Sequence, residues 1–332
     1  AKQLEKDFRH IGRALCAGDG LCSTSCPVGI NVGDYIHLLR EQALTKSEKR
    51  LGYWAGEHLS EVGDMLTGVL GVAHVAKCVL GDKMTTIVGK GLYYGSGKNL
   101  PLWTPSLPRP VRKRAIEIAR EYGVVHGLKG LSDKRVVYFP SCINQRLGSG
   151  KTPLINDMTE VLNKAGFEVI FPENMENLCC GTIWESKGMP DEAMRKTREL
   201  EAALRHASED GRWPILCDQS PCLHRMRETM PHLRLYEPAE FIDKFVLSEL
   251  EITPLDTCVA VHVTCSTRKM NVTQHLLHVA QACATQVLVP EEIGCCAFAG
   301  DKGFTHPELN AWALRKLRGQ VEQAHATMGV SN

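Results

Sequence analysis

The chain has almost no net charge. Its 332 residues include 39 lysines and arginines and 38 aspartates and glutamates, which leaves a formal charge of +1. Proteins that bind nucleic acid usually carry a basic surface, so we expect no nucleic-acid partner. The hydrophobic and charged fractions, 43% and 23%, are ordinary for a globular protein. The length suffices for two or three domains with cores of their own.

Long apolar runs are also missing. A membrane-spanning helix needs about 20 mostly apolar residues, and the nearest candidate, residues 69–80, is interrupted by His74 and Lys77. No secretory signal peptide is recognisable. Together these absences predict a cytoplasmic protein, whose cysteines serve metal binding or redox chemistry rather than disulfides.

Nucleotide-binding loops are absent as well. Gly89-Lys90-Gly91 lacks the third glycine of a dinucleotide fingerprint, and the stretch 91–98 has one residue too many for a P-loop. The sequence therefore predicts only a flexible, glycine-rich loop at these positions.

Cysteine, in contrast, is abundant. The chain has 14 cysteines. Two stretches each place one cysteine upstream of an adjacent pair: Cys142 precedes Cys179-Cys180 with 36 residues between them, and Cys265 precedes Cys295-Cys296 with 29. Such an internal repeat marks a duplicated unit. Thiolates are preferred ligands of soft metals and iron–sulfur clusters, so both stretches are predicted metal sites.

The residues around these cysteines repeat too. An apolar run precedes each lone cysteine, at 136–141 and 259–264, and another precedes each pair, at 168–172 and 286–290. Short apolar runs bounded by turn residues are typical of buried strands, and helical patterns lie between them. Each repeat thus predicts a parallel α/β unit, in which ligands gather at the carboxyl ends of the strands.

A third group of cysteines lies in residues 16–27. These residues follow the bacterial ferredoxin pattern C-x-x-C-x-x-C-x-x-x-C-P at Cys16, Cys22 and Cys26, with Asp19 where the second cysteine belongs. A carboxylate can ligate iron, though it is a harder ligand than thiolate. The motif predicts a 4Fe–4S cluster with one oxygen ligand, or a 3Fe–4S cluster that lacks that iron.

The sequence divides into four regions. Residues 1–100 are predicted to be a helical, ferredoxin-like region, and 101–130 to be a proline-rich linker with one helix. Four prolines within 101–110 exclude a helix interior or a central strand there. Residues 131–250 and 255–332 are predicted α/β units. The fold class is therefore mixed, α+β or α/β, and we expect the two units to be lobes related by an approximate two-fold.

These motifs together resemble a known family. The segments Cys-Ala-Gly-Asp-Gly-Leu-Cys-Ser-Thr-Ser-Cys-Pro, Glu-Asn-Leu-Cys-Cys-Gly-Thr and Gly-Cys-Cys-Ala-Phe-Ala-Gly-Asp run in order along the chain. They resemble the C-terminal iron–sulfur half of the FAD-dependent D-lactate dehydrogenases. The α/β part is similar to the cysteine-rich CCG domain, which also occurs in glycolate oxidase iron–sulfur subunits and in the heterodisulfide reductase catalytic subunit.

The resemblance implies an oxidoreductase. In that family an FAD-binding domain and a complete ferredoxin-type motif precede this region, and the flavin oxidises a D-2-hydroxy acid. The chain is therefore expected to belong to a longer enzyme or to be a separate subunit, and to pass electrons from reduced FAD to a quinone or cytochrome. We expect no D-lactate oxidation by this chain alone. Its expected location is the cytoplasm, or the inner face of the membrane through peripheral association.

The resemblance also implies a ligand set for each CCG repeat. The family closes a repeat with C-x-x-C, whereas here Cys217 and Cys222 have four residues between them; we favour Cys222 as the ligand and Cys217 as a strand residue. The second repeat has Ala297 in place of Gly181 and no cysteine further on. The predicted ligands are Cys142, Cys179, Cys180 and Cys222 in the first site and Cys265, Cys295 and Cys296 in the second.

Two other interpretations stay open. Four thiolates also suit a structural zinc ion, so zinc is the alternative at a CCG site. Thiol–disulfide chemistry, as in the heterodisulfide reductase relatives, would need a reactive thiolate pair or an unusual cluster. His262 and Asp301 flank the second site and are candidates for tuning it. Cys258 and Cys283 lie in apolar patterns and are predicted core residues.

Overall fold

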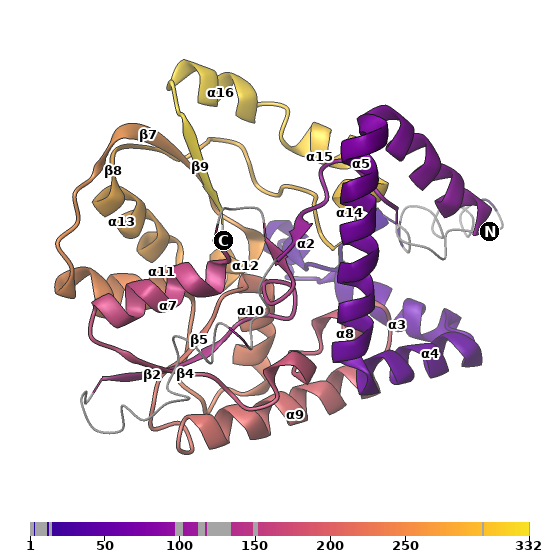
Figure 1. The fold of residues 1–332 in the computed structure, drawn as a ribbon, viewed down its shortest axis with the longest axis horizontal. Helices are drawn as coiled ribbons and strands as arrows, with labels where there is room; N and C mark the ends of the chain where they lie inside the picture. Colours follow the sequence, from indigo (N-terminus) through magenta and orange to yellow (C-terminus); the bar gives the residue numbers. More distant parts are fainter. Residues whose placement is uncertain are drawn as a thin grey trace.

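The computed structural model describes most of the chain, and the predicted helix at 111–122 and Asp301 lie largely or wholly outside the described part. In Figure 1 the N-terminal helices stand on one side of the molecule and the sheets on the other. The described residues are 15–96, 102–111, 134–148, 152–300 and 302–331, with the single positions 3, 12 and 117.

The N-terminal region is helical, as its sequence predicts. Helix α2 (Leu21–Ser25) is followed by α3 (Val32–Ala43) and α4 (Lys46–Glu57). The Asn31 side chain accepts the Gly33 N–H and so caps α3. Thr45 and Glu48 form a capping box at the start of α4, which satisfies backbone donors that the first turn leaves free.

Helix α5 (Leu59–Gly95) is 37 residues long and turns at Gly81, whose φ of 76° is not helical. Most of its valines are exposed, with 72% of Val72 and 78% of Val79 accessible. By length and composition α5 is apolar enough to cross a membrane. The expectation that no segment is apolar enough was therefore wrong. His74 and Lys77 do interrupt residues 69–80, but small and apolar residues dominate the longer helix around them. The glycine-rich stretch 89–95, expected to be a loop, is the end of this helix.

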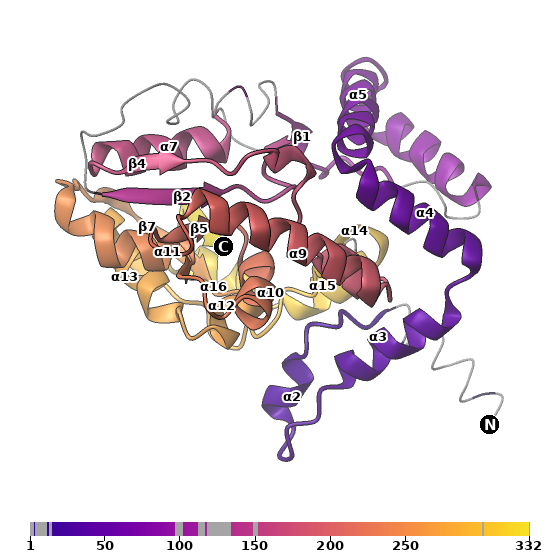
Figure 2. The same cartoon turned by 90° about the horizontal axis from the view of Figure 1, so that it is seen from below.

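Glycines bring α4 and α5 close to the first α/β unit. A side chain at Gly56 would overlap Glu192, and one at Gly63 would overlap Arg146. The Trp184 indole N–H donates to the Gly52 carbonyl at 3.0 Å. In Figure 2, helix α9 (Pro190–Ala207) extends from the sheets toward α4. Glycine positions therefore let the N-terminal helices pack closely on the α/β part.

The first sheet is parallel, with strand order β4-β2-β5-β6. Its core contains Val136, Leu162, Leu200 and Met226, all fully buried, from strand β2 and from three helices that follow it in the sequence. The strands are β2 (Arg135–Phe139), β4 (Glu168–Ile170), β5 (Ile215–Cys217) and β6 (Leu235–Tyr236).

The second sheet is parallel too, with the order β8-β7-β9. Its strands are β7 (Leu255–His262), β8 (Ala284–Leu288) and β9 (Met328–Ser331). A smaller core lies against it and includes Val259, Val261 and Leu276. The strands that precede the lone cysteines, β2 and β7, occupy equivalent places. Strand β2 lies between β4 and β5, and β7 lies between β8 and β9. The mixed α/β class with parallel sheets is confirmed, whereas the ferredoxin-like fold and the two-fold relation stay predictions.

Shorter elements complete the connections. The proline-rich stretch contributes β1, which pairs antiparallel with β3, and Trp103 is buried near Gly89 of α5. The remaining elements are β1 (Arg109–Pro110), β3 (Leu147–Gly148), α7 (Leu154–Lys164), η3 (Met175–Asn177), α8 (Thr182–Ser186), α10 (Ser220–Thr229), α11 (Pro238–Phe241), the π-helical η4 (Ile242–Val246), η5 (Leu247–Glu249), α12 (Cys265–Lys269), α13 (Thr273–Cys283), α14 (Lys302–Thr305), α15 (Pro307–Ala313) and α16 (Leu317–Gln323).

Candidate metal centres

The four cysteines predicted for the first CCG site lie together. Their thiols interact in sequence: Cys142 with Cys179, Cys179 with Cys180, and Cys180 with Cys222. Cys142 follows β2, the pair follows β4, and Cys222 lies in α10 after β5. The carboxyl ends of three parallel strands thus deliver all four sulfurs to one place, as expected for ligands on such a sheet.

These interactions lower the pKa of two of the thiols and raise the pKa of the other two. Hydrogen bonds from Cys179 and Cys222 hold the pKa of Cys180 well below its ordinary value, and a bond from Cys179 lowers the pKa of Cys142. The same bonds raise the pKa of Cys179 and of Cys222 well above it. Cysteine binds metals as thiolate, so binding of a cation at this site would be linked to the release of protons.

Cys217 and Cys222 have different surroundings. Cys217 is fully buried at the end of β5, and burial raises its pKa well above the ordinary value. Cys222 is the one that contacts Cys180. The structure therefore places Cys222, rather than Cys217, next to the other three thiols.

Two buried charged residues support the first site. Asp218 accepts the Ser141 N–H and the Tyr138 hydroxyl, both at 2.8 Å, and so fixes the turn before Cys142. The Arg225 Nε donates to the Cys180 carbonyl at 2.8 Å, and its guanidinium is paired with Glu185. Sequence reasoning missed both residues. The only local signal was the position of Asp218 between Cys217 and Cys222.

The second CCG site repeats this geometry in part. The Cys265 and Cys295 sulfurs are 3.9 Å apart, which matches the interaction of Cys142 with Cys179. The Ala297 N–H donates to the Cys295 sulfur at 3.2 Å, and the Gly181 N–H donates to the Cys179 sulfur at 3.5 Å. A hydrogen bond to Cys295 raises the pKa of Cys296. Both repeats therefore hold the first cysteine of the pair in the same way.

Asp19 lies at the second CCG site. Its carboxylate is 3.9 Å from the Cys295 sulfur, and the ligand atoms of Asp19, Cys265 and Cys295 all lie within 4.8 Å of one another. Within the described residues, no comparable group joins Asp19 to two of the ferredoxin-type cysteines. The sequence pattern had assigned Asp19 to that cluster.

The three ferredoxin-type cysteines each accept backbone hydrogen bonds. The Gly18 N–H donates to the Cys16 sulfur at 3.4 Å, and the Val32 N–H donates to the Cys22 sulfur at 3.3 Å. Backbone N–H groups of Ile30 and Val28 lower the pKa of Cys26. Hydrogen bonds of this kind stabilise thiolates and tune cluster potentials, so these residues suit a thiolate-bound cluster.

Polar contacts join the three groups of cysteines. The Ser220 hydroxyl, two residues before Cys222, is 3.2 Å from the Thr264 hydroxyl, the residue before Cys265. Arg40 donates to the carbonyl of Cys16 at 2.7 Å and to that of Ser186, in α8 after the first cysteine pair, at 2.8 Å. Segments far apart in the sequence thus converge on one region.

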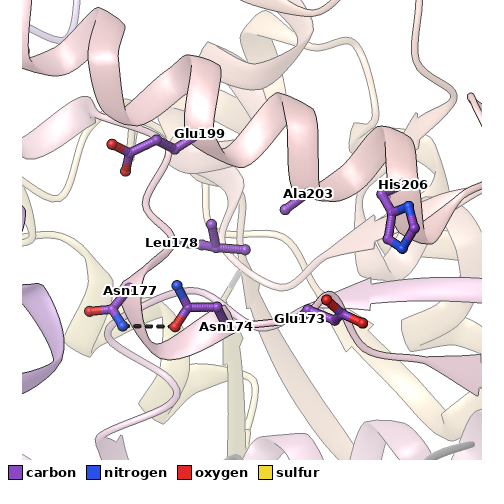
Figure 3. Close-up of a pocket in the computed structure, with 7 residues that line it drawn as sticks. All are labelled: Glu173, Asn174, Asn177, Leu178, Glu199, Ala203 and His206. Carbon is purple, nitrogen blue, oxygen red and sulfur yellow. Dashed lines mark hydrogen bonds between the residues drawn. The ribbon is translucent and has the colours of Figure 1, made fainter.

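One cavity lies beside this region rather than in it. It measures about 410 Å³, and Figure 3 shows Asn177 donating to Asn174 at its wall. Leu178 lines the cavity and adjoins Cys179, but the lining contains no thiol. The lining residues are Glu173, Asn174, Asn177, Leu178, Glu199, Ala203 and His206.

The remaining candidates have separate environments. Cys258 is buried in β7, as predicted, whereas Cys283 is exposed at the end of α13, which corrects its assignment to the core. His262 ends β7 and contacts the Ser331 hydroxyl at 3.2 Å, and burial lowers its pKa.

Comparison with known proteins identifies the cysteine-rich part. Residues 136–227 and 259–328 each match the family model of the CCG cysteine-rich domain. The two matches contain the cysteines of the first and the second site respectively. No curated protein and no solved structure matches the chain.

Proposed function

We propose, on the premise that this chain belongs to the family of proteins with cysteine-rich CCG domains, that it is the iron–sulfur electron-transfer part of an FAD-dependent D-2-hydroxy acid dehydrogenase, with D-lactate as the expected substrate. The observation that carries the proposal is the convergence of three cysteine groups on one region. An isolated structural site would not need three groups of thiols from segments so far apart.

The chain's own residues would hold the centres and set their properties. Cys16, Cys22 and Cys26 would bind the ferredoxin-type cluster, with backbone N–H groups directed at their sulfurs. Cys142, Cys179, Cys180 and Cys222 would bind the first CCG centre, with the Arg225 cation beside them. Iron–sulfur clusters supply one-electron acceptance and release, at potentials that hydrogen bonds, charge and burial determine.

The partners follow from this role. The donor would be reduced FAD in a flavin-binding domain or subunit, and the acceptor a quinone or a cytochrome. Helix α5 supports an acceptor at the membrane, because its exposed valines would lie favourably at the apolar surface of a bilayer. We place the protein in the cytoplasm, in peripheral contact with the inner face of the membrane.

Metal analysis with electron paramagnetic resonance tests the proposal. Protein purified without oxygen should contain iron and acid-labile sulfide well in excess of zinc, and dithionite should produce a spectrum of reduced clusters. Addition of the flavin-bearing part and D-lactate should produce the same spectrum without dithionite. Zinc as the dominant metal would instead support a structural role. Flavin reduction by D-lactate with no cluster signal would refute electron transfer to this chain.

A further inference from the structure

The Asp19 carboxylate and the second CCG site come from regions 276 residues apart in the sequence. The Cys295 sulfur lies 3.9 Å from Asp19 and 3.9 Å from Cys265. We propose that Asp19 is the fourth ligand of a metal ion in the second CCG site, together with Cys265, Cys295 and Cys296. The ligand set is three sulfurs and one oxygen, which suits a divalent ion of the Zn²⁺ or Fe²⁺ type.

The spacing of the three atoms fits one ion. Metal–sulfur bonds of about 2.3 Å and a metal–oxygen bond of about 2.1 Å in a tetrahedron would place two sulfurs about 3.8 Å apart and a sulfur and an oxygen about 3.6 Å apart. Both observed separations are 3.9 Å. The ligand atoms of Asp19 and Cys265 also lie within 4.8 Å of each other, so the three side chains surround one position that suits a single ion.

The loop around Asp19 directs its carboxylate to this place. Gly18 and Gly20 on either side have φ of 69° and 67°, a conformation that favours glycine. The Leu21 N–H donates to one carboxylate oxygen at 3.2 Å, and the other oxygen is the one near Cys295. The Lys269 ammonium in α12, the helix that begins at Cys265, donates to the Asp19 carbonyl.

The two sites are built alike in part. Cys222 brings a further ligand atom to Cys142, Cys179 and Cys180. Among the described residues, the Asp19 carboxylate is the group that lies with Cys265 and Cys295 within the reach of one ion. The inference rests on the proposed function in one respect, the ferredoxin-type cluster of residues 16–27. If Asp19 binds the ion of the second CCG site, that cluster keeps only Cys16, Cys22 and Cys26 as ligands.

Cobalt binding tests the ligand assignment directly. Metal-free protein with Cys180→Ser, which disables the first site, is titrated with Co²⁺ alone under anaerobic conditions. Asp19→Asn should weaken binding at the second site at least about tenfold. Asp19→Cys should restore it with stronger thiolate-to-cobalt absorption, because four sulfurs replace three. Asp82→Asn, which removes a carboxylate of α5 that is paired with Lys77, is the matched control and should change nothing.

Two further measurements keep the result specific. In protein with Cys180 intact, Asp19→Asn should still bind Co²⁺ at the first site, which shows that the variant is folded. In a Cys296→Ser background the effect of Asp19→Asn should disappear. An equal effect in that background, or unchanged Co²⁺ affinity and absorption in Asp19→Asn, would overturn the proposal.

Metal analysis of the natively loaded protein identifies the ion. The element that Asp19→Asn loses, zinc or iron, is the ion that the second site holds. The two proposals fail separately. Absence of iron and of cluster signals would refute the proposed electron transfer and leave the cobalt result standing, whereas unchanged cobalt binding in Asp19→Asn would refute only the role of Asp19.

Discussion

Gly181 and Ala297 stand directly after the two cysteine pairs, and both have a left-handed backbone, with φ of 90° and 54°. Each also donates its N–H to the first sulfur of its pair. The conformation that turns this N–H toward the sulfur is therefore kept in both repeats, although only the first has the residue that adopts it without strain. In the second repeat an alanine is held in a conformation that costs about 1–2 kcal/mol.

Exchange of the two residues should have opposite effects. Ala297→Gly removes the strain and should raise the free energy of unfolding by up to about 1 kcal/mol. Gly181→Ala should lower it by more than that, because the new methyl group would also overlap the Ala193 carbonyl oxygen. Urea unfolding of the two variants and the parent measures both effects. A loss of stability in Ala297→Gly would show that the alanine methyl group makes contacts worth more than the strain.

Serine substitutions should separate the ligand from the strand residue near the first site. Cys180→Ser should remove the metal of that site, because a serine oxygen is a harder ligand than thiolate and matches iron or zinc poorly. Cys217→Ser should keep the metal and lose about 1–2 kcal/mol of stability through its buried hydroxyl. Metal content and unfolding are measured on both. Loss of metal from Cys217→Ser with retention in Cys180→Ser would reverse the assignment.

In the D-lactate reaction of the complete enzyme, Cys180→Ser has a second expected effect. Flavin reduction in stopped-flow should persist, while steady-state reduction of the acceptor falls at least about tenfold, because the metal centre lies after the flavin in the proposed path. An equal fall in both rates would mean that the cysteine pair supports the flavin site or the fold instead.

The stability of the protein should fall in mild acid. Burial, with help from Arg40, lowers the pKa of His37, so the folded protein binds this proton less readily than the unfolded chain, whose histidines titrate near pH 6.5. The contribution is complete above about pH 6.5 and is lost as the pH falls from there toward the lower pKa of the folded state. His262 shifts in the same direction.

His37→Gln isolates the share of that residue. Urea unfolding at pH 7.5 and 5.5 should show a smaller loss in His37→Gln than in the parent, with the remainder due to His262 and other groups. An identical loss in both proteins would exclude His37 as a source of the pH dependence.

Helix α5 should bind lipid. Wild-type protein should sediment with vesicles of phosphatidylcholine and phosphatidylglycerol, and Val79→Asp should reduce the bound fraction several-fold, because a charge replaces an exposed apolar side chain. Gln281→Asp places the same charge on an exposed position of α13 and should have no effect. Wild-type protein that stays in solution would indicate that another protein covers this helix.

The sequence predicts the sheets well because their signals are local. The apolar runs at 136–141 and 259–264 become β2 and β7, and the runs before the cysteine pairs become β4 and β8, since short apolar segments between turns have few other conformations in a folded core. The same logic groups Cys142 with Cys179 and Cys265 with Cys295.

What the sequence could not predict depends on contacts between distant segments. Asp19 fits the ferredoxin spacing, and nothing near it signals that Lys269 and Cys295 are its neighbours. In the sequence, Arg225 looks like a cation on the surface of a helix, yet it is buried against Cys180. The apolar character of helix α5 was underestimated, because scattered single charges lower the mean hydropathy of a long segment less than that of a short one.

The position of Asp19 also has a consequence in time. The motif of residues 16–27 leaves the ribosome well before Cys265 and Cys295, which follow after roughly 250 and 280 more residues, at about 5–20 residues per second. The second site cannot be assembled before the first α/β unit has been made and the N-terminal helices have found their place on it. Metal binding at the second CCG site is therefore a late step in biogenesis. A bound ion shows that the segments around Asp19 and Cys295 have reached their folded positions.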